Sequence, residues 1–191
     1  MNREPILNAE ERAFLAAARR ATLATLDPDG KPRLVPICFV IGGNDDRLGR
    51  PLLYTPIDEK NKASSDPKQL SRVRDLLVLP EAVVLADRWD EDWSQLGWVR
   101  VYGRGEILEP QPHEREEHAR VVTALRAKYE QYRDHNLETR PIIRVTIGRS
   151  RSWGNLAAAS AERAAGVRER APRPSGGGSG SSSSPGDTRR R

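Results

Sequence analysis

The sequence predicts a mainly β protein, a small antiparallel barrel of six strands with helices at its periphery. Six short segments carry the apolar patterns typical of strands, and most of them follow one another as meanders joined by turns. Strands and helices do not alternate regularly along the chain. A doubly wound parallel sheet requires such alternation, so an antiparallel barrel is the better interpretation.

Three helices are expected around the strands. Asn8 followed by Glu11 has the spacing of a capping box, which starts a helix that ends near residue 20. Apolar residues at helical spacing predict a second helix over residues 68–79, stopped by Pro80, and a third over residues 111–132.

The six strands are predicted over residues 21–26, 33–41, 51–55, 81–88, 98–108 and 141–153. The first two form a hairpin, because Pro28 presets φ and Gly30 can adopt a positive φ in the turn between them. Gly103 and Gly105 allow the fifth strand to bend, as a closing barrel requires.

The second strand, residues 33–41, is apolar on both faces. Such a strand needs cover on both sides, from the barrel interior and from another layer or subunit. Pro36 has no backbone N–H, so the strand is locally unpaired or bulged there and a ligand can approach its backbone.

Composition limits the possible partners and the setting. The 191 residues carry a net charge of +5, of which +4 lies in residues 165–191, where six Arg face Glu169 and Asp187. Residues 161–191 are therefore expected to be a disordered basic tail after a domain of residues 1–160, and specific nucleic-acid binding is not expected. Cys38 is the only cysteine, and no signal peptide or membrane span is evident, so a cytoplasmic protein is expected.

Familiar enzyme signatures are missing from the sequence. It has no phosphate-binding glycine loop, no HExxH motif and no GxSxG motif. His113, His118 and His135 are interpreted as solvated, and the acidic pairs as ordinary surface charge. No metal site is expected, and no catalytic acid or base can be named.

Cations beside strand ends, together with tryptophans, remain as candidate binding residues. Lys60 and Lys62 follow a strand and could bind phosphate as point charges. Trp98 and Arg100 share one face of a strand, and Arg151 and Trp153 repeat that spacing on another. An aromatic ring beside a cation suits a flat, anionic, aromatic ligand. The alternatives are solvated lysines and tryptophans that pack in the core or at a dimer interface.

The order of these segments resembles a known superfamily. The segments are ERAFLAAARRATLATLDPDGKPRLVPICFVI, PLLYTPIDEKNK, LADRWDEDWSQLGWVRVYGRGEIL and IIRVTIGRSRSWG, within residues 10–154. They resemble the pyridoxamine 5'-phosphate oxidase-like proteins, and most closely the branch of oxidoreductases that depend on the deazaflavin coenzyme F-420.

The resemblance implies a homodimer of split β-barrels that holds two cofactors at the subunit interface. It implies that the backbone of Val35, Pro36, Ile37 and Cys38 runs along the cofactor ring. It places phosphate contacts at Thr55, Lys60 and Lys62, and further cofactor contacts at Trp98, Arg100 and Trp153. The oxidases carry an Arg-Lys pair where this chain has Lys-Asn-Lys, and their C-terminal Arg and His have no counterpart after Trp153. Oxidation of pyridoxamine phosphate is therefore not expected.

The leading hypothesis is hydride transfer between reduced F-420 and a small conjugated or unsaturated substrate. The alternatives are an FMN-dependent oxidoreductase of the same fold, a carrier or storage protein that binds the cofactor without turnover, and a nucleic-acid binder that acts through its tail.

Overall fold

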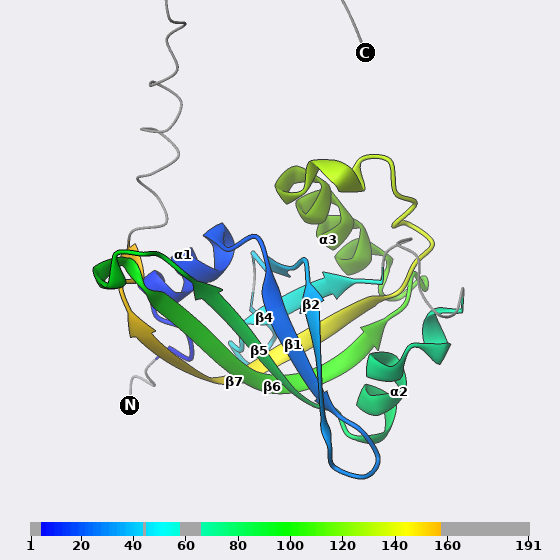
Figure 1. The fold of residues 1–191 in the computed structure, drawn as a ribbon. Helices are drawn as coiled ribbons and strands as arrows, with labels where there is room; N and C mark the ends of the chain where they lie inside the picture. The colour runs from blue at the N-terminus through cyan, green and yellow to red at the C-terminus, as the bar shows by residue number, and fades with distance from the viewer. Residues whose placement is uncertain (1–4, 44, 58–65, 158–191) are drawn as a thin grey trace, which may run out of the picture. The chain divides into compact units, whose positions relative to one another are not determined.

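The computed structural model describes residues 5–43, 45–57 and 66–157. They form one antiparallel sheet of seven strands, in the order β2-β1-β5-β6-β7-β4-β3, with three α-helices. Figure 1 shows the sheet curled into a half-barrel, which confirms the predicted fold class. The helices are α1 (Ala9–Ala17), α2 (Ser71–Val78) and α3 (Arg115–Lys128), and the strands are β1 (Ala21–Leu26), β2 (Pro32–Ile37), β3 (Val40–Ile41), β4 (Leu52–Pro56), β5 (Glu81–Arg88), β6 (Gly97–Leu108) and β7 (Ile142–Gly154).

The helices begin and end for local reasons. At the start of α1, the Asn8 side chain accepts the N–H of Glu11 at 2.8 Å, and the Glu11 carboxylate accepts the N–H of Asn8 at 3.1 Å. This capping box confirms the predicted start of α1. The helix ends at Ala17, short of residue 20, and α3 is shorter at both ends than its predicted range.

The β1–β2 hairpin is confirmed, and one aspartate organises its turn. The Asp27 carboxylate accepts the N–H of Asp29 at 3.0 Å and that of Lys31 at 2.9 Å, and Gly30 has a φ of 78°. The backbone hydrogen bond from Lys31 lowers the pKa of Asp27, as do hydrogen bonds from the Arg33 side chain and the Asp29 backbone, although burial of the carboxylate opposes this. The bend predicted in the fifth strand is also present, as a register shift of β6 against β7 between Tyr102 and Gly103.

The single strand predicted over residues 33–41 is wrong, because the chain divides there into β2 and β3. The Tyr129 hydroxyl accepts the N–H of Phe39 at 2.9 Å and donates to its carbonyl oxygen at 2.8 Å. A side chain thus satisfies the Phe39 backbone groups that a strand neighbour would otherwise bind. The division raises the strand count from six to seven and leaves β2 and β3 at opposite ends of the strand order.

The apolar core has two parts. The inner part fills the half-barrel, where α1 contributes Phe14 and Leu15 and α2 contributes Val73 and Leu76. Figure 1 shows these two helices at opposite ends of the curled sheet. The outer part lies between α3 and the outer face of β4 and β7, and it includes Leu52, Tyr54, Val121, Val122, Leu125, Tyr129 and Ile142.

One histidine prediction is wrong. His118 is buried at 3% exposure, and its Nε2 lies 2.8 Å from the Arg140 carbonyl oxygen, to which it donates. This hydrogen bond joins α3 to the segment before β7, whereas the sequence predicted a solvated side chain for His118. His113 is exposed as predicted, whereas His135 is half-buried, with its ring edge-on to Tyr132.

Several predictions fall outside the described residues. Lys60 and Lys62 lie there, as does the whole of the predicted basic tail, residues 161–191. Their roles stay predictions. Among the described residues, no helix combines the length and the apolar character needed to span a membrane.

Candidate functional site

The outer face of β6 and β7 carries a cluster of aromatic and cationic side chains. Val99 and Val101 of β6 point into the core and are fully buried, so their neighbours point outward. In the β6–β7 register, Trp98 is opposite Trp153, Arg100 is opposite Arg151 and Tyr102 is opposite Arg149. We call these six residues the Trp–Arg face.

The side chains of this face contact one another through ring–cation interactions. The Arg100 guanidinium carbon lies 5.2 Å from the centre of the Trp98 ring and 5.3 Å from that of Tyr102. The Arg149 guanidinium carbon lies 4.1 Å from the centre of the Tyr102 ring. The predicted pairing of Trp98 with Arg100 is thus present, and the strand register sets Trp153 and Arg151 opposite these two residues.

Within the described part of the chain, no carboxylate neutralises the three arginines of the face. Among the described residues, none of Arg100, Arg149 and Arg151 takes part in an ion pair. The Arg100 Nε is buried and has no hydrogen-bond partner there. A buried donor without a partner is costly, and an anionic ligand oxygen would satisfy it. A planar anion such as a phosphate-bearing flavin or deazaflavin therefore fits these residues in charge and in shape.

The structure places the other predicted residues elsewhere. Pro36 of β2 lies in the same cross-strand row as Arg100, but β1 and β5 lie between their strands. Three strand spacings put the two backbones about 14 Å apart within one chain. Ile37 is buried on the core side, whereas Val35 and Cys38 are half-buried. The sheet thus brings Trp98, Arg100 and Trp153 together, whereas residues 35–38 lie apart from them.

Thr55 of β4 belongs to neither group. It is 2% exposed and faces Ile143 of β7 in the strand register. Its predicted phosphate contact stays a prediction, as do those of Lys60 and Lys62.

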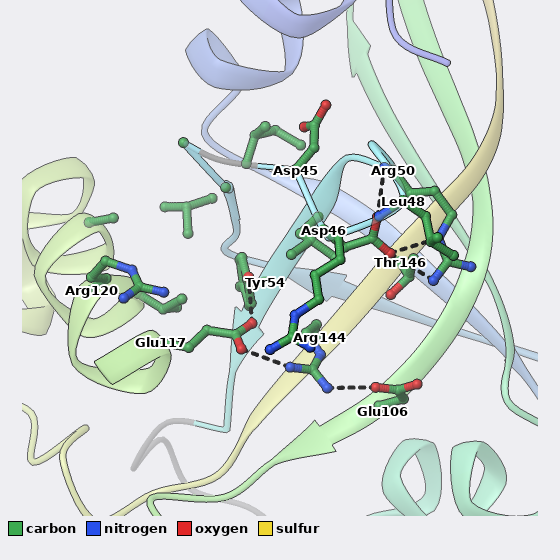
Figure 2. Close-up of a pocket in the computed structure, with 18 residues that line it drawn as sticks. Asp45, Asp46, Leu48, Arg50, Tyr54, Glu106, Glu117, Arg120, Arg144 and Thr146 are labelled. Carbon is green, nitrogen blue, oxygen red and sulfur yellow. Dashed lines mark hydrogen bonds and ion pairs between the residues drawn. The ribbon is translucent and has the colours of Figure 1, made fainter. Parts of the chain in front are cut away.

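Sequence reasoning missed a second polar group, on the outer face of β4, β6 and β7 beneath α3. The Tyr54 hydroxyl donates to Glu117 at 2.7 Å, and Arg144 donates to Glu117 at 2.8 Å and to Glu106 at 2.7 Å. Figure 2 shows these four side chains converging. The interpretation of Glu117 as ordinary surface charge is therefore wrong. The signal that could have found it is the spacing of Glu114 and Glu117, which puts two carboxylates on one face of α3.

The environment of this network shifts the pKa of two of its members. Burial raises the pKa of Tyr54 above its ordinary value, and the hydrogen bond to Glu117 raises it further. Burial lowers the pKa of Arg144, but hydrogen bonds to Glu106 and Glu117 outweigh burial and raise it overall. Both side chains therefore keep their protons at all ordinary pH values, so the network is not suited to proton transfer.

Beside this network lies a cavity with a volume of about 790 Å³. It opens between α3, the loop that joins β3 to β4, and the outer face of β4, β6 and β7 (Figure 2). No residue of the Trp–Arg face and none of the predicted site residues lines it. No group of three or more potential metal ligands occurs among the described residues.

Comparison with solved structures finds the same fold in several proteins. A conserved hypothetical protein from Mycobacterium tuberculosis is 24% identical over 94% of this chain and 98% of its own, with a TM-score of 0.57. An FAD-binding protein from Mesorhizobium loti is 21% identical over 76% of this chain and 94% of its own, with a TM-score of 0.53. The heme storage protein HutZ from Vibrio cholerae is 14% identical over 78% and 94%, with a TM-score of 0.54.

No curated protein sequence matches the chain. The family model for pyridoxamine 5'-phosphate oxidase matches residues 7–154, which span every strand and helix of the described structure. The chain therefore belongs to the pyridoxamine 5'-phosphate oxidase family.

Proposed function

We propose that this protein is a cytoplasmic, homodimeric oxidoreductase that transfers a hydride between reduced coenzyme F-420 and a small conjugated or unsaturated substrate. The observation that carries the proposal is the Trp–Arg face of a chain of this family, where three arginines without a carboxylate partner in the described structure lie beside two tryptophans. When bound, the cofactor supplies the redox chemistry.

The residues of the Trp–Arg face bind and orient the cofactor. Arg100, Arg149 and Arg151 neutralise its phosphate or the anionic edge of its ring, and Arg100 Nε gains the partner that it lacks. Trp98 and Trp153 provide flat apolar surface against the ring and exclude water from it.

A second copy of the chain would complete the site. Within one chain, β1 and β5 separate β2 from the Trp–Arg face. The backbone of β2 and the Trp–Arg face are therefore too far apart to contact the same edge of a cofactor ring. The outer side of β2 is open, and Leu34 on it is 67% exposed. In a dimer with a two-fold axis, β2 of each copy would lie against β6 and β7 of the other copy and cover Leu34. The dimer would then have two equivalent sites, each formed by β2 of one copy and the Trp–Arg face of the other.

The same cluster fits FMN, whose ring and phosphate present a similar pattern of charge. FMN-dependent oxidoreduction is therefore the second candidate. A carrier without turnover is the third, since the fold also occurs in a heme storage protein.

The test is to titrate the purified full-length protein with F-420 and with FMN, and to read mass and ligand by native mass spectrometry. We expect a dimer that binds two molecules of F-420 and reduces a conjugated substrate.

Arg100→Gln should weaken binding at least tenfold, whereas Arg104→Gln should not, because Arg104 lies on the same strand but is already paired with Glu81 at 3.0 Å. Binding of FMN alone would favour the second candidate, and binding without reduction of any substrate would favour the third. A monomer that binds neither cofactor at micromolar concentration would refute the proposal.

A further inference from the structure

The side chains that line the cavity of about 790 Å³ beneath α3 favour one class of ligand. We propose that it binds a small organic anion, an apolar body that carries one carboxylate or phosphate group. The inference goes beyond the proposed redox function, because the cavity shares no residue with the Trp–Arg face.

The cavity is apolar on its inner side. Val40 and Leu52 line it from β3 and β4, and Val121 and Ala124 line it from α3. Val40, Leu52 and Val121 are buried, whereas Ala124 is half-buried. An apolar ligand body against these side chains would gain roughly 25 cal/mol for each Å² of its own apolar surface that leaves water.

The carboxylates of the cavity wall are already engaged by cations of the protein. Asp45 is paired with Arg12 at 2.9 Å, and Asp46 with Arg50 at 2.7 Å. Asp46 also accepts the N–H groups of Leu48 and Arg50, and hydrogen bonds from Arg50 lower its pKa.

The other two wall carboxylates, Glu106 and Glu117, share Arg144, which also lies 3.8 Å from Glu114. Each carboxylate of the wall therefore already has a guanidinium partner within the protein.

Two guanidinium groups at the cavity are not neutralised in this way. Among the described residues, Arg47 takes part in no ion pair or hydrogen bond. The ion pair of Arg120 is with Glu116 at 3.9 Å, and the two side chains are 64% and 96% exposed. Such an exposed, long pair contributes almost nothing. Figure 2 shows Arg120 directed toward the cavity, and its charge acts on Tyr54 inside.

An apolar inner surface beside two guanidinium groups that no close ion pair of the described residues neutralises selects an amphipathic anion. Guanidinium groups bind carboxylate and phosphate oxygens through charge-assisted hydrogen bonds, and the apolar wall holds the rest of the molecule. The volume is within the roughly 300–1,000 Å³ typical of pockets that bury a drug-sized ligand. A cation would meet the charges of Arg47 and Arg120, and each carboxylate of the wall is already paired with an arginine.

The test is calorimetric titration of the full-length protein with octanoate, octyl phosphate and the neutral octanol, whose flexible chains lack the flat ring that suits the Trp–Arg face. We expect both anions to bind at least tenfold more tightly than the neutral probe, and the tighter anion identifies the preferred head group. In the double variant Arg47→Gln, Arg120→Gln the anions should lose at least tenfold in affinity. Ala124→Trp, which fills the cavity without changing charge, should abolish binding of all three probes.

Two controls separate this site from the rest of the surface. Arg133→Gln removes an exposed arginine outside the cavity, and Arg100→Gln alters the Trp–Arg face; both should bind the anions as the wild type does. Anion affinities that are unchanged in the double variant, or equal for charged and neutral probes, overturn the proposal. So does an equal loss in Arg100→Gln, which would place the probe on the Trp–Arg face. Because no step requires turnover, failure of the redox proposal leaves this test intact.

Discussion

Replacing Tyr129 with phenylalanine tests the link that divides β2 from β3. The hydroxyl makes two hydrogen bonds, one from the Phe39 N–H at 2.9 Å and one to the Phe39 carbonyl at 2.8 Å. Phe39 is fully buried and Tyr129 is 1% exposed, so water does not replace the missing hydroxyl. Leaving a buried backbone group unsatisfied costs about 1–3 kcal/mol, and two groups lose their partner here. Tyr129→Phe should therefore lower the free energy of unfolding by roughly 2–6 kcal/mol.

The assay is urea unfolding of the full-length protein followed by far-ultraviolet circular dichroism. Tyr102→Phe is the matched control, because the Tyr102 hydroxyl makes no hydrogen bond within the described residues. Removing that hydroxyl should change the free energy of unfolding by no more than about 0.5 kcal/mol. If Tyr129→Phe costs less than about 1 kcal/mol, the Phe39 backbone finds other partners and the explanation for the divided strand is wrong.

Three more perturbations have outcomes fixed by the geometry or the sequence. Burial raises the pKa of Tyr129 from 10.0 to about 12, so the folded state holds this proton more tightly than the unfolded chain. The resulting stability is complete below pH 10 and is lost as the pH rises to about 12. The urea midpoint of the wild type should therefore fall across this window, and that of Tyr129→Phe should fall less. A flat midpoint in the wild type, or an equal fall in Tyr129→Phe, contradicts the assignment of this loss to Tyr129. Gly103→Ala forces a methyl group against the Thr146 carbonyl at the β6 bulge and should cost about 1–3 kcal/mol, measured by the same unfolding assay. Gly148→Ala, whose methyl group would meet only Tyr102 O at 3.9 Å, should be nearly neutral, and equal effects would show that the bulge adapts. The double variant Lys60→Ala, Lys62→Ala should weaken cofactor binding by about 1.5–3 kcal/mol for each charge-assisted hydrogen bond that it removes, measured by titration. Lys31→Ala at the hairpin tip is the control and should leave the affinity unchanged. Unchanged affinity in the double variant would place the phosphate elsewhere.

Local signals predict much of the fold. The sequence locates β5 to the residue, because its buried and exposed positions alternate and Pro80 separates it from α2. The capping box and the hairpin turn are equally local, since their partners lie within four residues of each other.

The features that sequence reasoning missed depend on residues far apart in the chain. The division at Phe39 requires Tyr129, 90 positions away, and the role of Glu117 requires Arg144 from a strand that follows α3. The Trp–Arg face was partly predictable, because period-two spacing puts Trp98 and Arg100 on one side of a strand. The register that sets Trp98 opposite Trp153 is a property of the assembled sheet.

The strand order has a consequence for how the chain can assemble. β3 and β4 reach the rest of the sheet only through β7, the last strand to be synthesised. β1, β2, β5 and β6 can pair as soon as residue 108 has emerged, but the β3–β4 hairpin must then wait for residues 142–146. We therefore expect a chain that stops before β7 to expose Leu53 and Ile57, which are fully buried here, and to be captured by chaperones or to aggregate.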